Sequence, residues 1–172
     1  VLTMQQGQLL AGKRGLVMGV ANEKSIAWGI AAAVAAQGAE IAFSYQMEGF
    51  GKRLKPLAES IGSSLLIECD VATDGAVESC FKQLAKDWPE IDFVVHALAY
   101  SDKAELKGAY LDTSRDNFIN TMMISAYSFT EVARAARPMM PAGGSLVTLS
   151  YIGAQRITPN YNVMGVAKAA LE

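Results

Sequence analysis

Two kinds of hydrophobic pattern alternate along the chain. Five short runs are apolar on consecutive positions and rich in β-branched residues: 15–20, 40–45, 64–70, 91–98 and 145–152. Between them lie longer segments with helical spacing: 25–37, about 51–61, 74–87, about 114–136, and a last one that opens near 160. This alternation predicts strand–helix–strand units with right-handed crossovers. Runs such as FVVHAL, apolar at each position, indicate strands that are covered on both faces.

The pattern therefore predicts an α/β fold, a three-layer doubly wound parallel sheet of the Rossmann-like kind. The helical spacing at AKAALE runs on to Glu172 without a glycine or another stop signal. We therefore expect a single Rossmann-type domain over residues 1–172, in a truncated chain. The long non-periodic stretch 99–113 follows the fourth strand at its carboxyl end, where open α/β sheets bind ligands.

Composition and charge narrow the class of protein. The chain is 51% hydrophobic and 19% charged, with a net charge of −2, so we expect neither nucleic acid nor a membrane surface as a partner. The longest apolar stretch, 26–36, is shorter than the roughly 20 residues that cross a bilayer, and the first 14 residues lack the features of a secretory signal. Cys69 and Cys80 form no CxxC and suggest reduced core residues, and one histidine makes a metal site unfavourable. We expect a cytoplasmic, metal-free protein.

The loop after the first strand, GVANEKSIAWG, has the features of an anion site. Gly19 allows a tight turn and a close approach of a ligand to the backbone. Ser25 is a predicted N-cap, and the free N–H groups behind it could bind a pyrophosphate. Gly29 would let the helix pack closely on the strand. Glycines are common in any strand-to-helix turn, so an ordinary connection remains an alternative.

The ends of the second and third strands offer polar groups for a nucleotide. Gln46 is neutral and can hydrogen-bond a ribose hydroxyl, with Glu48 nearby, which favours NADH over NADPH. Lys52 and Arg53 are expected on the exposed start of the next helix. Asp70 can accept a hydrogen bond from an adenine amino group, or it can cap the turn that follows it. Both roles stay open.

A phenol and an amine stand seven residues apart in YNVMGVAK, at Tyr161 and Lys168. Seven helical residues rise about 10.5 Å and return to the same face. With Asn160 as the predicted N-cap, Tyr161 would stand at the mouth of the helix, and the nearby ammonium would lower the pKa of the phenol. Tyr161 could then donate to a developing oxyanion, with Tyr151 converging from the end of the fifth strand. Such a pair on one helical face also occurs without any function.

These motifs together resemble the short-chain dehydrogenase/reductase superfamily. Common members carry Tyr-x3-Lys, but position 165 is glycine here. The spacing Tyr161…Lys168, the glycine region G-x5-S-x-A-x-G and the stretch PNYNVMGVAKAALE resemble the divergent branch of bacterial NADH-dependent enoyl-[acyl-carrier-protein] reductases. The resemblance covers essentially the whole chain.

The resemblance implies an NAD-binding domain and a reaction in which hydride passes from NADH to C3 of a trans-2-enoyl thioester during fatty acid elongation. Tyr161 would stabilise the enolate oxygen, Lys168 would hold the nicotinamide ribose, and Tyr151 would lie along the substrate. The implied cofactor-binding residues are Gly19, Ser25, Ile26, Gln46, Asp70, Val71, Leu98 and Lys168, and the implied substrate-binding residues are Ala99, Tyr100, Tyr151 and Tyr161. The family also implies C-terminal strands that would follow residue 172 and are missing from this chain. It further implies a homotetramer that receives enoyl chains on acyl carrier protein.

The sequence departs from the family pattern at one position, and two other functions remain as alternatives to the enoyl reductase. Many family members have glycine where Ala99 stands, and the extra methyl group is expected to reduce inhibitor fit more than NADH binding. A carbonyl reductase of the same superfamily would need a serine and Tyr-x3-Lys. A non-catalytic NAD-binding module would keep the regions of Gly19 and Asp70 without needing the tyrosines and the lysine. His96, with apolar neighbours, is expected to be a hydrogen-bonded core residue rather than an acid or base.

Overall fold

A computed structural model describes residues 6–172, so the first five residues of the segment inspected for a secretory signal lie outside the described part. The described chain contains a five-stranded sheet in the order β3-β2-β1-β4-β5, and each pair of neighbours is parallel. The strands are β1 (Arg14–Met18), β2 (Glu40–Tyr45), β3 (Leu66–Glu68), β4 (Phe93–His96) and β5 (Ser145–Thr148). The predicted parallel sheet is confirmed.

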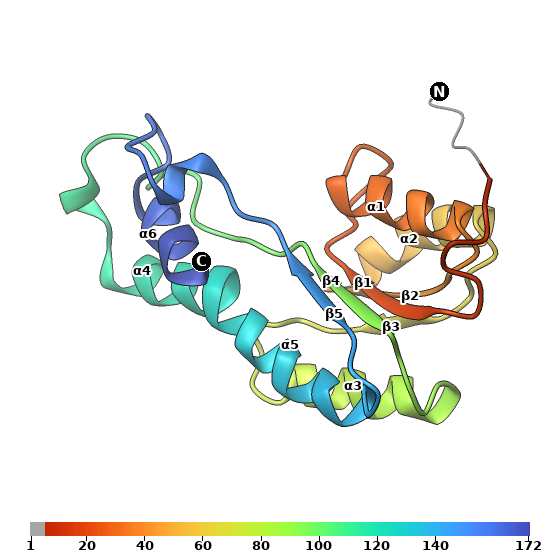
Figure 1. The fold of residues 1–172 in the computed structure, drawn as a ribbon. Coiled ribbons are helices and arrows are strands. Elements are labelled where there is room, and N and C mark those ends of the chain that lie inside the picture. Colours follow the sequence, from red (N-terminus) through yellow and green to blue (C-terminus); the bar gives the residue numbers. More distant parts are fainter. Residues whose placement is uncertain (1–5) are drawn as a thin grey trace.

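Helices cover both faces of the sheet, which gives the predicted three layers (Figure 1). α1 and α2 lie on one face, and α3 and α5 lie on the other. The helices are α1 (Ile26–Ala36), α2 (Glu48–Ser60), α3 (Ala76–Asp87), α4 (Arg115–Met122), α5 (Ser128–Ala136) and α6 (Asn162–Leu171). Short turns of 3₁₀ helix are η1 (Tyr110–Asp112), η3 (Arg137–Met139) and η4 (Ile152–Ala154), and η2 (Met123–Tyr127) is a turn of π helix.

The central strands are buried on both faces, as their continuous apolar runs predict. Leu16 and Met18 of β1 face the core under α3 and α5, whereas Val17 between them faces the core under α1 and α2. All three are fully buried. Because successive side chains point to opposite faces, one strand contributes side chains to both cores. This alternation fixes the register of the sheet against both helical layers.

β5 and α6 are placed differently. β5 is the edge strand, and its Leu146 and Val147 are 37% and 43% exposed. α6 packs against α4, η2 and η4, beyond the edge of the sheet (Figure 1). The C-terminal part of the chain is therefore attached at one side of the layered body.

Several predicted element boundaries are wrong, including those of the third and fifth strands and of the helix over 114–136. The third strand is shorter than 64–70 because Asp70 turns the chain, its Oδ1 accepting from Ala72 N–H at 3.1 Å. The fifth strand ends at Thr148, and η4 follows. The helix expected over 114–136 is interrupted by η2, where the Ser128 hydroxyl donates to the carbonyl of Ile124 at 2.6 Å. A serine bonded back to the preceding turn loosens the regular helical ladder.

No helix within residues 6–172 combines the length and apolar character needed to cross a membrane.

Candidate active site

A cavity of about 520 Å³ opens where β1, β2, β3 and β4 end, and we call it the sheet-end cavity. Its volume lies within the range of small-molecule sites, and its position at the carboxyl ends of the strands is the one expected of this fold. Of the predicted site residues, it is lined by Gly19, Gln46, Asp70, Val71, Leu98, Ala99 and Tyr100. The structure therefore brings together residues from four strand ends that are far apart in the sequence.

Gly19 is required by the backbone at this point. Its φ is +101°, and a Cβ atom there would stand 2.1 Å from the carbonyl oxygen of Ala97. Both observations exclude a side chain, since L-residues with a Cβ atom avoid positive φ and the Ala97 carbonyl is part of the rigid backbone. The tight turn predicted at Gly19 is confirmed. The absence of a side chain there allows close contact between the end of β1 and the segment after β4.

Ser25 occupies the N-cap position of α1, but its side chain does not cap the helix. Its Oγ accepts hydrogen bonds from the N–H groups of Ala21 and Asn22, at 3.0 and 3.1 Å, and so shapes the loop that precedes the helix. The first N–H groups of a helix have no partner inside it and can bind an anion. Ser25 and the exposed Ile26 lie outside the sheet-end cavity, next to this helix end.

The predicted packing role of Gly29 is wrong. A Cβ atom at this position would meet no other atom of residues 6–172 within 4 Å, apart from the neighbouring backbone of its own helix. Gly29 faces solvent from α1, because the contact with the sheet is made by the buried Ala27 and Ala31.

Asp70 performs the structural role that its position allows. Its Oδ1 accepts from Ala72 N–H at 3.1 Å and, more weakly, from Nε2 of Gln46 at 3.4 Å. The amide and carboxylate thus lie side by side at the rim of the sheet-end cavity. The turn role of Asp70 is confirmed, and its role toward adenine remains a prediction.

Several cavity-lining residues escaped the sequence analysis, among them Phe50, Asn120 and Ile124. Phe50 lies in the first turn of α2 with the guanidinium of Arg53 over its ring, 4.6 Å from the centroid. Asn120 and Ile124 line the same cavity from α4 and η2. Their four-residue spacing was the available signal, but it becomes meaningful only once α4 is known to lie beside the strand ends.

The two tyrosines meet at the mouth of α6. The ring centroids of Tyr151 and Tyr161 are 5.0 Å apart in an edge-to-face arrangement, as was expected of converging side chains. Tyr161 lies over Gly153, where a Cβ atom would come within 2.3 Å of its ring. The predicted cap is wrong, because Tyr161 itself is the N-cap, and Asn160 takes a left-handed conformation with φ of +59°.

Lys168 is buried on α6, at 6% exposure, and its Nζ donates to the carbonyl of Leu149 at 2.7 Å. Burial lowers the pKa of Lys168. The expected lowering of the phenol pKa is wrong, since burial and the neighbouring Tyr151 raise the pKa of Tyr161. The ammonium is engaged by a backbone carbonyl, and the phenol remains a protonated donor.

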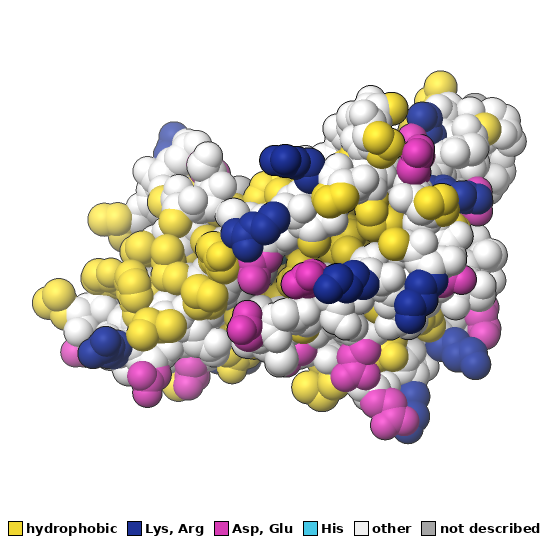
Figure 2. All heavy atoms as spheres, turned by 90° about the horizontal axis from the view of Figure 1, so that it is seen from below, with side chains coloured by type: hydrophobic (Ala, Val, Ile, Leu, Met, Phe, Trp, Pro, Cys, Tyr) yellow, Lys and Arg dark blue, Asp and Glu magenta, His cyan; other side chains and the backbone are white. Residues whose placement is uncertain are grey.

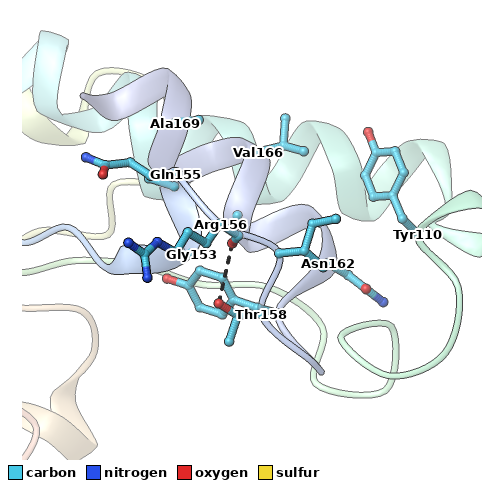
Figure 3. A pocket seen from close by; sticks show the side chains of 12 residues that line it. Tyr110, Gly153, Gln155, Arg156, Thr158, Asn162, Val166 and Ala169 are labelled. Atoms are coloured by element: carbon cyan, nitrogen blue, oxygen red, sulfur yellow. Dashed lines mark hydrogen bonds between the residues drawn. The ribbon is translucent and has the colours of Figure 1, made fainter.

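A second cavity of about 500 Å³ lies between α6 and the segment from η4 to Thr158, and we call it the α6 cavity. Tyr161 lines it, whereas Tyr151 and Lys168 lie outside both cavities. Figure 3 shows Tyr110 at one end and Gln155 and Arg156 at the other. The structure thus unites the tyrosines and the lysine around α6 but does not place them in the sheet-end cavity.

Asn162 ties the loop 99–113 to α6. Its Nδ2 donates to the carbonyls of Glu105 and Gly108, at 3.4 and 3.2 Å, from a left-handed residue with φ of +38°. This link places the loop beside the helix that carries Tyr161.

His96 is fully buried with both ring nitrogens in hydrogen bonds, which confirms it as a core residue. Cys69 and Cys80 are free and buried, as expected. Within residues 6–172, no three His, Cys, Asp or Glu side chains are grouped so as to hold a metal ion.

The chain is similar to proteins of one family. A family model described as Enoyl-(Acyl carrier protein) reductase matches residues 19–172. An enoyl-[acyl-carrier-protein] reductase [NADH] 2 of Rhizobium meliloti is 58% identical over 164 residues, which are 95% of this chain and 61% of that protein. The corresponding Aquifex aeolicus protein is 47% identical over 95% of this chain and 61% of its own length. The chain therefore spans about three-fifths of the length of these curated relatives.

Solved structures give the same result. A reductase of this name from Anaplasma phagocytophilum, in complex with NAD, superposes with a TM-score of 0.94 at 57% identity, over 98% of this chain and 65% of that one. FabI from Candidatus Liberibacter asiaticus gives a TM-score of 0.95 at 52% identity, over 96% of this chain and 64% of that one.

Proposed function

Because the chain belongs to the enoyl-(acyl carrier protein) reductase family, we propose that it reduces trans-2-enoyl thioesters on acyl carrier protein to saturated thioesters, with NADH, in fatty acid synthesis. The observation that carries this proposal is the edge-to-face contact of Tyr151 and Tyr161 at the mouth of the helix that bears Lys168. A phenol with its proton retained stands there beside a second aromatic ring.

The residues around the sheet-end cavity fit an adenine dinucleotide. Gln46 and Asp70 offer an amide and a carboxylate at one rim, suited to ribose hydroxyls and an adenine amino group. The neutral Gln46 favours NADH over NADPH, because a ribose phosphate would seek a cation at this place. Gly19, Val71 and Leu98 would line the same site, with Ser25 and Ile26 at the helix end that would receive the pyrophosphate.

The reduced nicotinamide would supply the hydride that is added to C3 of the enoyl chain. Tyr161 would donate a hydrogen bond to the thioester oxygen as negative charge develops there. The raised pKa of Tyr161 supports this role, since a phenol that keeps its proton at neutral pH can donate it. Tyr151 would lie against the acyl chain, with Ala99 and Tyr100 on the other side, and Lys168 would orient the nicotinamide ribose.

We infer that the working form is a cytoplasmic homotetramer. Figure 2 shows hydrophobic side chains gathered on the side of the molecule where α4 lies, and Phe118, Ile119, Met123 and Tyr127 of α4 and η2 are exposed. An exposed apolar helix face of this kind is typical of a subunit interface. Free, buried cysteines support a reducing compartment.

The test follows NADH absorbance at 340 nm with crotonyl and longer enoyl thioesters, and with 3-oxoacyl thioesters in parallel. Oxidation of NADH by the enoyl substrates alone supports the proposal. Oxidation by 3-oxoacyl thioesters alone would instead indicate a carbonyl reductase. In Tyr161→Phe we expect turnover to fall by roughly a hundredfold, as when an oxyanion donor is removed, with little change in NADH affinity.

A non-catalytic NAD-binding module is the second candidate. It is favoured by one observation, that Tyr151 and Lys168 lie outside the sheet-end cavity. Binding of NADH without turnover of any thioester, in the protein that contains this chain, would decide for it.

A further inference from the structure

His96 joins three elements that border the candidate site. It is the last residue of β4, and the strand register pairs it with Thr148 at the end of β5. Its Nδ1 lies 3.0 Å from Oγ1 of Thr148, and its Nε2 lies 2.8 Å from Oγ of Ser128 on α5. The ring therefore ties the edge strand and a helix to the centre of the sheet.

The hydrogen bonds of its neighbours determine where the ring carries its proton. The Ser128 hydroxyl has one proton, which it donates to the carbonyl of Ile124 at 2.6 Å. Its oxygen must then accept from Nε2–H of His96. Nδ1 is then unprotonated and accepts from the Thr148 hydroxyl. Each polar atom in this chain of contacts therefore has a hydrogen-bond partner.

The environment keeps the ring neutral. Burial lowers the pKa of His96 to about 4, and the positive charge of Lys168 acts in the same direction. A neutral ring also suits the hydrogen bonds, because an unprotonated Nδ1 can accept from the Thr148 hydroxyl.

Both ends of this chain of contacts reach the candidate site. At one end, Ile124 lines the sheet-end cavity. At the other, Thr148 precedes Leu149, whose carbonyl holds the ammonium of Lys168 at 2.7 Å. Within residues 6–172, β5 pairs with β4, and Thr148 is the last residue of that pairing.

We propose that His96 is a positioning residue for Lys168: its neutral ring, with the proton on Nε2, fixes the end of β5 and thereby the carbonyl of Leu149 that orients the ammonium. This inference rests on the proposed function, in which Lys168 serves NADH. The histidine touches no reactant itself.

The tautomer can be tested directly, because His96 is the single histidine of the 172 residues. Nitrogen NMR of the imidazole at pH 7 should show a protonated Nε2 and an unprotonated Nδ1. A proton on Nδ1, or an imidazolium, would overturn the proposal. The measurement needs no variant, so it does not depend on whether a substituted protein folds.

The positioning role is tested by a double-mutant cycle on NADH affinity, measured by fluorescence titration. Thr148→Val removes the hydroxyl and keeps the shape of the side chain, and we expect it to raise the Kd roughly fivefold to tenfold, the effect of one lost hydrogen bond. Thr148→Ser keeps the hydroxyl and should restore the wild-type Kd. In a Lys168→Met background, Thr148→Val should have no further effect.

The outcomes separate this inference from the proposed function. An equal loss of affinity with and without Lys168 means that Thr148 acts through general structure, and it overturns the positioning role alone. A wild-type protein that binds no NADH overturns the proposed function and this role together.

Discussion

Two regions of the molecule, which we call the nucleotide half and the tyrosine half, are built in different ways. In the nucleotide half, residues 14–98, helices cover both faces of the central strands, and Val17 and Phe43 are fully buried. In the tyrosine half, residues 145–172, the strand is at the sheet edge with Leu146 exposed, and α6 lies beyond that edge (Figure 1). The nucleotide half is a packed core with a cavity at the carboxyl ends of its strands. The tyrosine half lies at one side of this core, with α6 packed against α4, η2 and η4.

The difference shows what positions each part of the site. The sheet-end cavity is a consequence of strand register and two cores, which many side chains determine jointly. In the tyrosine half, α6 buries Val163, Met164 and Ala167. Three polar links add to this packing: Lys168 to Leu149, His96 to Thr148, and Asn162 to the loop 99–113. We therefore expect the nucleotide half to tolerate most surface changes, and the placement of Lys168 and of the loop 99–113 in the tyrosine half to respond to the loss of one hydrogen bond.

The largest effect is expected at Gly19, where the nucleotide half has no room for a side chain. Gly19→Ala places a methyl group 2.1 Å from a backbone oxygen in a left-handed residue, so the turn must open. We expect a loss of about 3 kcal/mol or more of unfolding free energy, together with loss of NADH binding. Urea unfolding followed by circular dichroism gives the first quantity and fluorescence titration the second. A urea midpoint equal to that of the wild type would contradict the expected loss of stability in Gly19→Ala.

Acid should weaken the junction between the halves. The folded-state pKa of His96, about 4, lies below the ordinary value of 6.5, so the unfolded chain binds more protons between these pH values. The stabilisation is present above pH 6.5 and is lost as the pH falls toward 4, by about 3 kcal/mol in total. Urea midpoints measured from pH 7 to pH 4.5 should fall, and the fall should be shallower in His96→Gln. Parallel pH profiles for the two proteins would exclude this cause.

A moderate effect is expected in the tyrosine half. Lys168→Ala removes a buried ammonium and its bond to Leu149, and we expect the Kd for NADH to rise about tenfold or more, as for a lost hydrogen bond to a charged group. Lys82→Ala is the matched control, since Lys82 is an exposed partner of Glu78 on α3 and should leave the Kd unchanged. Unchanged affinity in Lys168→Ala would refute the assigned role.

The smallest effect should be a gain in stability. Gly29→Ala adds a methyl group to the exposed side of α1, where it meets open space and reduces the freedom of the unfolded chain. We expect about 0.5–1 kcal/mol of added stability and the wild-type Kd for NADH. Destabilisation would mean that α1 approaches another surface at this glycine.

The nucleotide half was predictable because its signals are repeated along the chain. The run EIAFSY forms β2 with the predicted bounds, and the turn at Gly19 follows from one glycine after one strand. Strand order and layers then follow from general rules on crossovers. Local pattern and global fold agree in this half, so each reinforces the other.

The tyrosine half was less predictable because its geometry depends on partners that are distant in sequence. The pKa of Tyr161 was assigned from its spacing to Lys168, but burial and Tyr151 govern it. The left-handed Asn160 displaces the N-cap by one residue. At η2 the Ser128 hydroxyl bonds back to the carbonyl of Ile124, and hydrophobic periodicity does not predict such a bond.

The position of β5 has a consequence for handling the 172-residue chain. An edge strand presents a row of backbone N–H and C=O groups that can template pairing with another molecule, and here apolar Leu146 and Val147 flank that row. Concentrated samples should therefore self-associate through intermolecular β-structure. A lysine introduced at Val147 would act as a gatekeeper against such aggregation.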